Sequence, residues 1–239
     1  MIALEKSPQG AAIAFCEAIG RDPFFLLARE PNPSFRLQDL NGKRLSVVTE
    51  VPTPWMCLQH DLGLAGIDVK QVKVLPGRSM SESVAALRSG EADVIQVFQP
   101  FAATLLHQGT AHVWYAAASR GLVSYTTLNT TRAFAQNNPA ALTSMCKAMH
   151  RTLGWIAAHE ARELAELLAS WLPDVPVNIL TASFQAYKSV GLWNRTPILE
   201  RAGLEWLRDA ALATGILKRK IAYEDCVDMR YAEAALRDA

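Results

Sequence analysis

Apolar residues gather in short runs and in helically spaced stripes that follow one another along the first half of the chain. Runs bounded by turn residues predict buried strands at residues 24–28, 44–48, 71–75 and 93–98. Between these runs, apolar residues recur at helical spacing after Pro54 and again before Gly90, which closes the second helix. Residues 44–98 therefore follow the order strand, helix, strand, helix, strand, which predicts a parallel α/β sheet.

The second half of the chain is mostly helical. Asn137-Asn138-Pro139 opens a long predicted helix. Its apolar stripe consists of Leu142, Met145, Met149, Leu153 and Ile156. Further helices are predicted near residues 160–172, 178–190 and 197–214, and strand-like segments at 113–115 and 125–128.

This pattern divides the chain into two parts. Residues 34–118 form the predicted α/β lobe, and residues 1–33 and 119–239 form a mostly helical remainder. Phe24–Arg29 and Tyr125–Thr131 flank the lobe, so we expect them to connect the two parts.

Composition and charge narrow the class of protein. The 239 residues are 50% hydrophobic and 20% charged, as in a globular chain, and a net charge of +1 provides no basic field for nucleic acid. The four cysteines and five histidines show no metal-ligand spacing, and no cofactor-binding motif is present. No run reaches the about 18 apolar residues of a membrane span, and no signal peptide is visible at the N-terminus.

Three segments of the α/β lobe carry family-like motifs: residues 39–47 read DLNGKRLSV, residues 86–94 read ALRSGEADV, and residues 98–101 read FQPF. The first two resemble the DLKGKRLAV and ALxSGEADV segments of type II periplasmic binding proteins. The third lies where nitrate-, sulfonate- and pyrimidine-binding members carry an aromatic–x–Pro–x motif. The resemblance spans residues 24 to about 160 and is greatest to the NMT1/THI5-like branch.

The resemblance implies the periplasmic-binding-protein type II fold, an α/β fold whose two lobes close on a solute by a hinge. It implies capture of a sulfonate, nitrate, aromatic acid or pyrimidine in an interlobe cleft in the periplasm, and delivery to an ABC permease in the membrane, without cofactor or catalysis. Family members carry strand–helix units before the region that matches here, so the N-terminal lobe is expected to be incomplete. Helices after residue 138 would then expose apolar faces, which predicts self-association.

Loops at the carboxyl ends of parallel strands form the expected ligand crevice, here residues 49–54, 76–81 and 96–100. With two residues near the second crossing, these loops provide the expected ligand-binding set: Thr49, Glu50, Thr53, Trp55, Met80, Gln96, Gln99, Arg120 and Tyr125.

The first of these residues have two interpretations each. Thr53 before a proline fits a helix N-cap, and the helix N-terminus behind it either binds an oxyanion or binds nothing. Glu50 either faces the crevice, where it would favour a cationic solute, or is solvated at the surface. Trp55 shares a helical stripe with Leu58 and Leu62, so we expect it to pack in the core in preference to stacking on a ligand.

The remaining polar residues of this set require interaction partners if they are buried. Gln96 and Gln99 end a buried strand and require hydrogen-bond partners, which a solute or a neighbouring loop would supply. Arg120 would clamp an anion or, as a default, lie at the surface.

Two other functions remain open. Cys57 and His60 lie three residues apart on a predicted helix and could form a thiolate pair, as in desulfinases or thiamine-pyrimidine synthases on this fold. Catalytic pairs more often draw on separate elements, which argues against this interpretation. The effector-sensing domain of LysR-type transcription regulators has a similar fold and length, but no winged helix-turn-helix segment is visible in the sequence.

Overall fold

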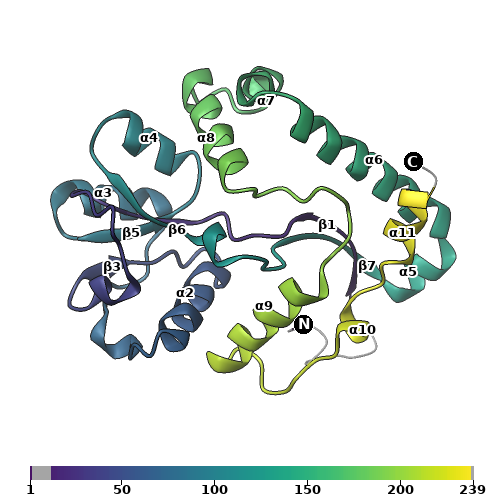
Figure 1. The fold of residues 1–239 in the computed structure, drawn as a ribbon, viewed down its shortest axis with the longest axis horizontal. Helices are drawn as coiled ribbons and strands as arrows, with labels where there is room; N and C mark the ends of the chain where they lie inside the picture. Colours follow the sequence, from purple (N-terminus) through teal and green to yellow (C-terminus); the bar gives the residue numbers. More distant parts are fainter. Residues whose placement is uncertain (2–11, 238–239) are drawn as a thin grey trace. The chain divides into compact units, whose positions relative to one another are not determined.

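The computed structural model describes residue 1 and residues 12–237, which fall into two compact units (Figure 1). Unit 1 comprises residues 1–22, 121–160 and 191–239. Unit 2 comprises residues 23–120 and 161–190. Each unit is described by itself below.

Unit 2 is built on a five-stranded sheet with the order β4-β3-β5-β2-β6. Strand β3 pairs in parallel with β4 and β5, whereas β2 pairs antiparallel with β5 and β6. The strands are β2 (Phe25–Ala28), β3 (Arg44–Ser46), β4 (Lys73–Val74), β5 (Val94–Val97) and β6 (His112–Ala116). The predicted strand–helix alternation over residues 44–98 is confirmed.

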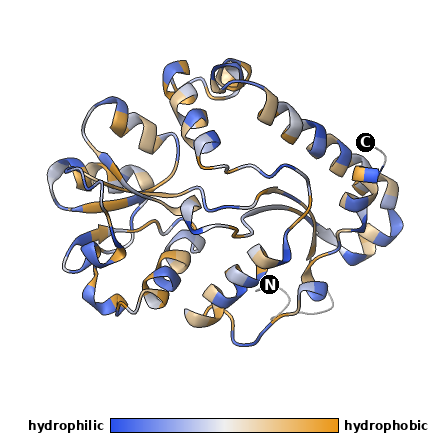
Figure 2. Ribbon diagram, in the orientation of Figure 1, coloured by the Kyte–Doolittle hydropathy of each residue, from blue (hydrophilic) through white to orange (hydrophobic). Residues whose placement is uncertain are grey.

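Helices cover both faces of this sheet. Leu58 and Leu62 of α2 (Thr53–Leu64) pack into an apolar cluster on one face. Residues of α3 (Met80–Ser89) and α4 (Phe101–His107), with Tyr187 of α8 (Val177–Ser189), pack into a second cluster on the other face. Because both faces are covered, β2 and β5 are buried at every residue and consist mainly of apolar residues (Figure 2).

Local sequence signals fix the ends of α3. Ser79 Oγ accepts a hydrogen bond from the Glu82 backbone N–H at 3.3 Å, and the Glu82 carboxylate accepts one from Ser79 N–H at 2.7 Å. This reciprocal pair is a capping box. Gly90 ends the helix with a φ of 80°, a left-handed conformation that glycine adopts without a Cβ clash.

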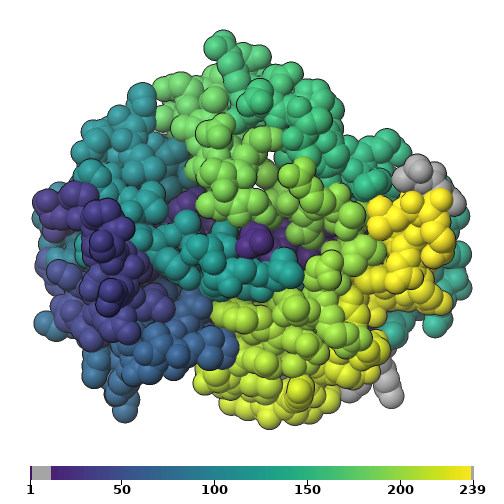
Figure 3. Space-filling model, in the orientation of Figure 1, coloured from purple at the N-terminus to yellow at the C-terminus, as the bar shows by residue number. Residues whose placement is uncertain are grey.

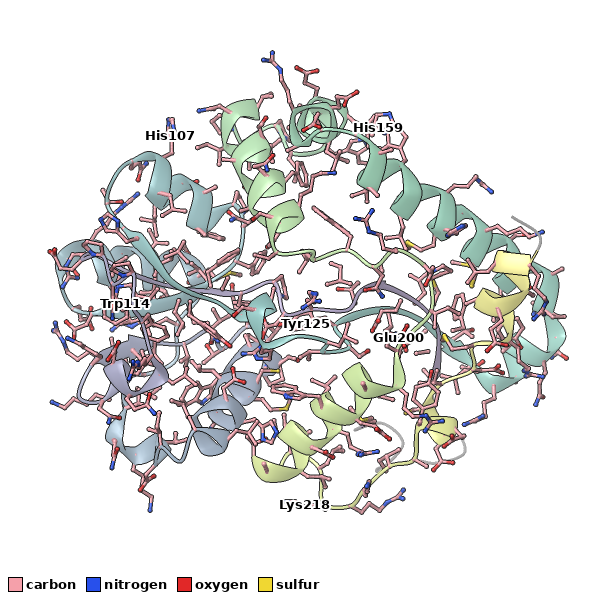
Figure 4. The ribbon with its side chains drawn as sticks, in the orientation of Figure 1. His107, Trp114, Tyr125, His159, Glu200 and Lys218 are labelled. Carbon is pink, nitrogen blue, oxygen red and sulfur yellow. The ribbon has the colours of Figure 1, made fainter. Side chains whose placement is uncertain are left out.

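The segment between β2 and β3 lies on the surface of unit 2, in dark purple at the left of Figure 3. It is anchored to β6 by Trp114, which is labelled in Figure 4. Trp114 Nε1 donates to the Glu30 carbonyl at 2.7 Å, and its ring lies 5.5 Å from that of Phe35. This aromatic contact joins the segment to the core cluster under α2.

Unit 1 contains a two-stranded antiparallel sheet of β1 (Ala12–Ile19) and β7 (Thr126–Thr131). Its helices are α5 (Arg132–Asn137), α6 (Pro139–Ala158), α9 (Arg201–Ala213), α10 (Tyr223–Cys226) and α11 (Arg230–Arg237). One apolar cluster is formed by β1, α6, α11 and the segments that connect them. The predicted start of the long helix at Pro139 is confirmed, but Met145 of its predicted buried stripe is 47% exposed because Cys146 occupies the buried position.

The structure divides the chain differently from the sequence-based boundaries. Phe24–Arg29, expected to be a crossing, contains β2 inside the sheet of unit 2. Helices α7 (Ala161–Leu168) and α8, expected in the helical remainder, also belong to unit 2. The reason is a long-range contact, because the Tyr187 ring stacks on Phe25 of β2 at 6.1 Å. The other expected crossing contains β7, which pairs with β1 in unit 1.

Candidate functional site

The loops that follow the parallel strands of unit 2 meet at one edge of its sheet. Val48 forms a parallel bridge with Arg78, and both the backbone N–H and the hydroxyl of Thr49 donate to the Arg78 carbonyl at 3.3 Å. The loop after β3 is thereby joined to the loop after β4. This edge is where ligands bind in open parallel sheets, so the expected loops are brought together.

Glu50 extends the contact between these two loops. Its carboxylate accepts a hydrogen bond at 3.1 Å from the backbone N–H of Met80, the first residue of α3. An acidic group is stabilised there by the partial positive charge of the helix N-terminus. Glu50 is exposed, but its charge is engaged by α3, which neither sequence-based interpretation foresaw. Met80 itself is half-buried and packs against the cluster between the sheet and α3.

The side chain of Gln96 connects strand β5 to the start of α2. Its side chain is 2% exposed, and its Nε2 donates to the Pro54 carbonyl at 2.9 Å. Its Oε1 is buried and has no hydrogen-bond partner among the described residues. One half of this amide is therefore satisfied by a neighbouring loop, and the other half needs a donor.

Gln99 follows β5 and holds α4 and α8 together. Its Oε1 accepts hydrogen bonds from the Ala103 backbone at 2.8 Å and from the Ser183 hydroxyl at 3.3 Å. Its backbone N–H donates to the Tyr187 hydroxyl at 3.1 Å. Its Nε2 is buried without a partner in the described part of the chain. Gln99 is thus mainly a structural link, with one donor left over.

The N-terminus of α2 lies at the same edge, and the prediction that Thr53 is its N-cap was wrong. The helix begins at Thr53, Pro52 is the N-cap, and no side chain caps the helix in the described structure. Because Pro54 is the second helical residue and lacks an N–H, the helix tolerates an N-cap without a polar side chain. Trp55 is half-buried and packs against the apolar cluster under α2, in agreement with the core interpretation.

The prediction that Arg120 is free to clamp an anion was also wrong. Its side chain is 5% exposed and pairs with Asp61 of α2, with Nε 2.9 Å from the carboxylate Oδ2. The hydroxyl of Tyr115 donates to the same oxygen at 3.3 Å, and burial raises the pKa of Tyr115 to about 12. A buried guanidinium requires such a partner, so the Arg120 side chain has a structural role.

Tyr125 belongs to unit 1, unlike the other expected ligand-binding residues. It is half-buried, directly precedes β7, and its backbone N–H donates to the Ile19 carbonyl at 3.1 Å (Figure 4).

Sequence reasoning missed a buried carboxyl in unit 1. Glu17 of β1 is 2% exposed, and its Oε2 accepts a hydrogen bond from Asn194 Nδ2 at 2.8 Å. Burial raises the pKa of Glu17 to about 7, and hydrogen bonds from Ser124 and Asn194 oppose the rise. The signal was present as a lone acidic residue inside the apolar run from Ile13 to Ile19.

The residues of the catalytic alternative lie on α2. Cys57 is fully buried in this helix, and His60 is half-buried one turn further on. A cysteine nucleophile must reach its substrate, so this burial counts against the pair. Among the described residues, no group of three or more His, Cys, Asp or Glu side chains is placed to hold a metal ion.

A hollow in unit 2, with a volume of about 730 Å³, lies between α3, α4 and the start of α8. Its lining is Ser81, Val84, Arg88, Pro100, Phe101, Thr104, Leu105, His107, Gln108, Asp174, Val175, Pro176, Asn178 and Ile179. Arg88 donates to Gln108 at 2.6 Å across this groove, so part of its polar lining is already paired.

The chain has the fold of the type II periplasmic binding proteins. The aliphatic sulphonate binding protein SsuA from Escherichia coli matches with a TM-score of 0.71 at 15% identity, over 95% of this chain and 72% of SsuA. The desulfurization enzyme DSZB matches with a TM-score of 0.68 at 17% identity, over 99% of this chain and 82% of the enzyme. The fold therefore occurs in both binding proteins and enzymes.

Sequence comparison gives the family within this fold. The NMT1/THI5-like family matches residues 3–163, so the chain belongs to that family. The chain is also 24% identical over 230 residues to YtlA of Bacillus subtilis (strain 168), whose name assigns it provisionally as a binding protein. That match covers 94% of this chain and 69% of YtlA. The helices of the described structure are too short or too polar to cross a membrane.

Proposed function

We propose that this protein is the solute-binding component of an ABC-type importer, which captures a small oxyanion or organic acid in the periplasm and delivers it to a membrane permease. Membership of the NMT1/THI5-like family and the likeness to SsuA support this assignment. Binding requires no cofactor and no covalent chemistry.

The observation that carries the proposal is the set of unsatisfied polar groups at the carboxyl edge of the unit 2 sheet. The N-terminus of α2 has no capping side chain, and Gln96 Oε1 lies buried beside it, because Gln96 is bonded to Pro54 in the first turn of that helix. Helix N–H groups favour an oxyanion, and a buried carbonyl oxygen requires a donor. A solute that carries an oxyanion together with an N–H or O–H group meets both needs.

The charged residues nearby leave this interpretation intact. Glu50, which would repel an anion, is bonded to the N-terminus of α3. Arg120 is paired with Asp61 and does not supply a clamp. Recognition then depends on neutral hydrogen-bonding groups and the α2 dipole.

The experiment is thermal unfolding of the chain against alkanesulfonates, aminosulfonates, nitrate, aromatic carboxylates and aminopyrimidines. A ligand at about 100 times its dissociation constant stabilises the fold by about 2.7 kcal/mol, which raises the melting temperature of a chain this long by roughly 5–10 °C. We expect the largest rise with a sulfonate that also carries a donor group.

Matched variants locate the site. Gln96→Met keeps the side-chain volume but removes both amide groups, and we expect it to abolish the ligand-induced rise. Gln71→Met makes the same change at an exposed position before β4, away from the carboxyl edge, and should leave the rise unchanged. Binding that survives Gln96→Met and is lost in Thr104→Arg would move the solute to the groove between α3, α4 and α8.

A further inference from the structure

Two cysteines from distant parts of the sequence meet in the core of unit 1. Cys16 lies on β1 and Cys146 on α6, and both are 0% exposed within the same apolar cluster. Strand β1 and helix α6 pack directly against each other. The two thiols are therefore held inside the unit by elements that the fold fixes in place.

A hydrogen bond places the sulfur atom of Cys146 beside the backbone of β1 next to Cys16. Cys146 Sγ donates to the carbonyl of Phe15, the residue that precedes Cys16, at 3.5 Å. Interaction with the Cys16 thiol lowers the pKa of Cys146, while interaction with the Cys146 thiol and burial raise the pKa of Cys16. Cys146 is thus the thiol of the pair that ionises first.

The other two cysteines do not share this arrangement. Cys226 is buried in the same cluster, but its thiol donates to the carbonyls of Ala222 and Tyr223 in its own helical turn, each at 3.5 Å. Cys57 lies in α2 of unit 2. They provide internal controls, because both are buried free thiols in other surroundings.

We propose that Cys16 and Cys146 form a disulfide when the chain folds in the presence of a small-molecule disulfide such as oxidised glutathione. The Cys146 thiolate attacks one sulfur of the reagent, which gives a mixed disulfide and releases one thiol. The Cys16 thiolate then attacks the Cys146 sulfur and releases the second thiol. The protein loses two protons and two electrons, and the reagent is reduced to two thiols.

The bond would join β1 to α6 across a very long loop of the chain, so it restricts the unfolded state strongly. This inference does not depend on the identity of the solute or on the proposed transport function, because it concerns only the core of unit 1.

The test is to refold the reduced, unfolded chain in a glutathione redox buffer, and to incubate the folded protein in the same buffer in parallel. Free thiols are then trapped with N-ethylmaleimide under denaturing conditions, and the chain is weighed intact and as peptides. We expect a chain lighter by two hydrogen atoms before alkylation, maleimide only on Cys57 and Cys226, and one peptide pair linked through Cys16 and Cys146.

Controls separate this pair from general oxidation. The double variant Cys57→Ala/Cys226→Ala should keep the linked peptides, and Cys146→Ala should lose them. The oxidised wild-type chain should melt roughly 5–10 °C above its reduced form. Maleimide on all four cysteines in both arms, or a link that involves Cys57 or Cys226, overturns the proposal.

Discussion

The buried carboxyl of Glu17 makes the stability of unit 1 depend on pH, and the substitution Glu17→Gln tests this dependence. Glu17 is 2% exposed on β1, where its Oε2 accepts a hydrogen bond from Asn194 while its Oε1 has no partner in the described residues. Burial penalises the charged form, and the nearby carboxylate of Glu200 adds to this penalty. Glutamine retains an oxygen for Asn194 and removes only the charge.

The magnitude follows from the shift in pKa from 4.5 to about 7. Below the lower value, both the folded and the unfolded chain hold the proton. Between the two values, the unfolded chain is ionised while the folded chain is protonated, so the free energy of unfolding falls by about 1.4 kcal/mol per pH unit. The total loss is on the order of 3 kcal/mol. This loss is complete near pH 7, and Glu17 does not change the free energy of unfolding further above that pH.

Denaturant unfolding at pH 5 and pH 8 measures this loss. The wild-type chain should lose about 2–3 kcal/mol more stability between these pH values than Glu17→Gln does. Glu233→Gln, which removes an exposed carboxylate of α11 in the same unit, should behave like the wild type. If wild type and Glu17→Gln show the same difference between the two pH values, the carboxyl titrates normally and the reasoning is refuted.

Three further predictions concern other parts of the fold. Asp61→Asn removes the carboxylate that pairs with the buried Arg120 guanidinium, so denaturant unfolding should show a loss of about 3–5 kcal/mol, and a loss below 1 kcal/mol would contradict the pairing. Ser79→Ala removes half of the capping box of α3 and should cost about 1 kcal/mol, whereas an unchanged midpoint would show that the cap contributes nothing. Trp171, which is 80% exposed after α7, is expected to promote self-association, so Trp171→Ser should lower the weight-average mass in sedimentation, and an unchanged mass would exclude this residue.

Features encoded by neighbouring residues could be predicted from the sequence. The end of helix α3 was predicted at Gly90, whose capping role depends only on residues within one turn. The parallel strands β3 and β5 were visible because they lie in short, mainly apolar runs bounded by turn residues, at residues 44–48 and 93–98. Local signals of this kind also placed the three loops at one edge of the sheet.

Features that depend on distant residues could not be predicted. The apolar run at Phe25–Ala28 identifies β2 as a strand but not its antiparallel position between β5 and β6. Arg120 looks like a free cation in the sequence because its partner Asp61 lies 59 residues away. Strand β1 escaped detection because Glu17 interrupts its apolar run, although that carboxyl is buried together with the four residues before it.

Under the proposed function, the distribution of satisfied and unsatisfied groups at the carboxyl edge limits the chemistry of the solute. Glu50 and Arg120 are the charged residues that were expected to determine solute selectivity. Both instead interact with other groups of the protein. The groups left over are neutral: the backbone N–H groups at the start of α2 and the buried Oε1 of Gln96. A half-satisfied buried amide costs about 1–3 kcal/mol, and an uncapped helix end adds to that cost. A bound solute that supplies the missing hydrogen-bond partners removes both costs, and this gain in free energy adds to its affinity. The unsatisfied groups at this edge therefore favour recognition through hydrogen bonds to an oxyanion over recognition through a salt bridge.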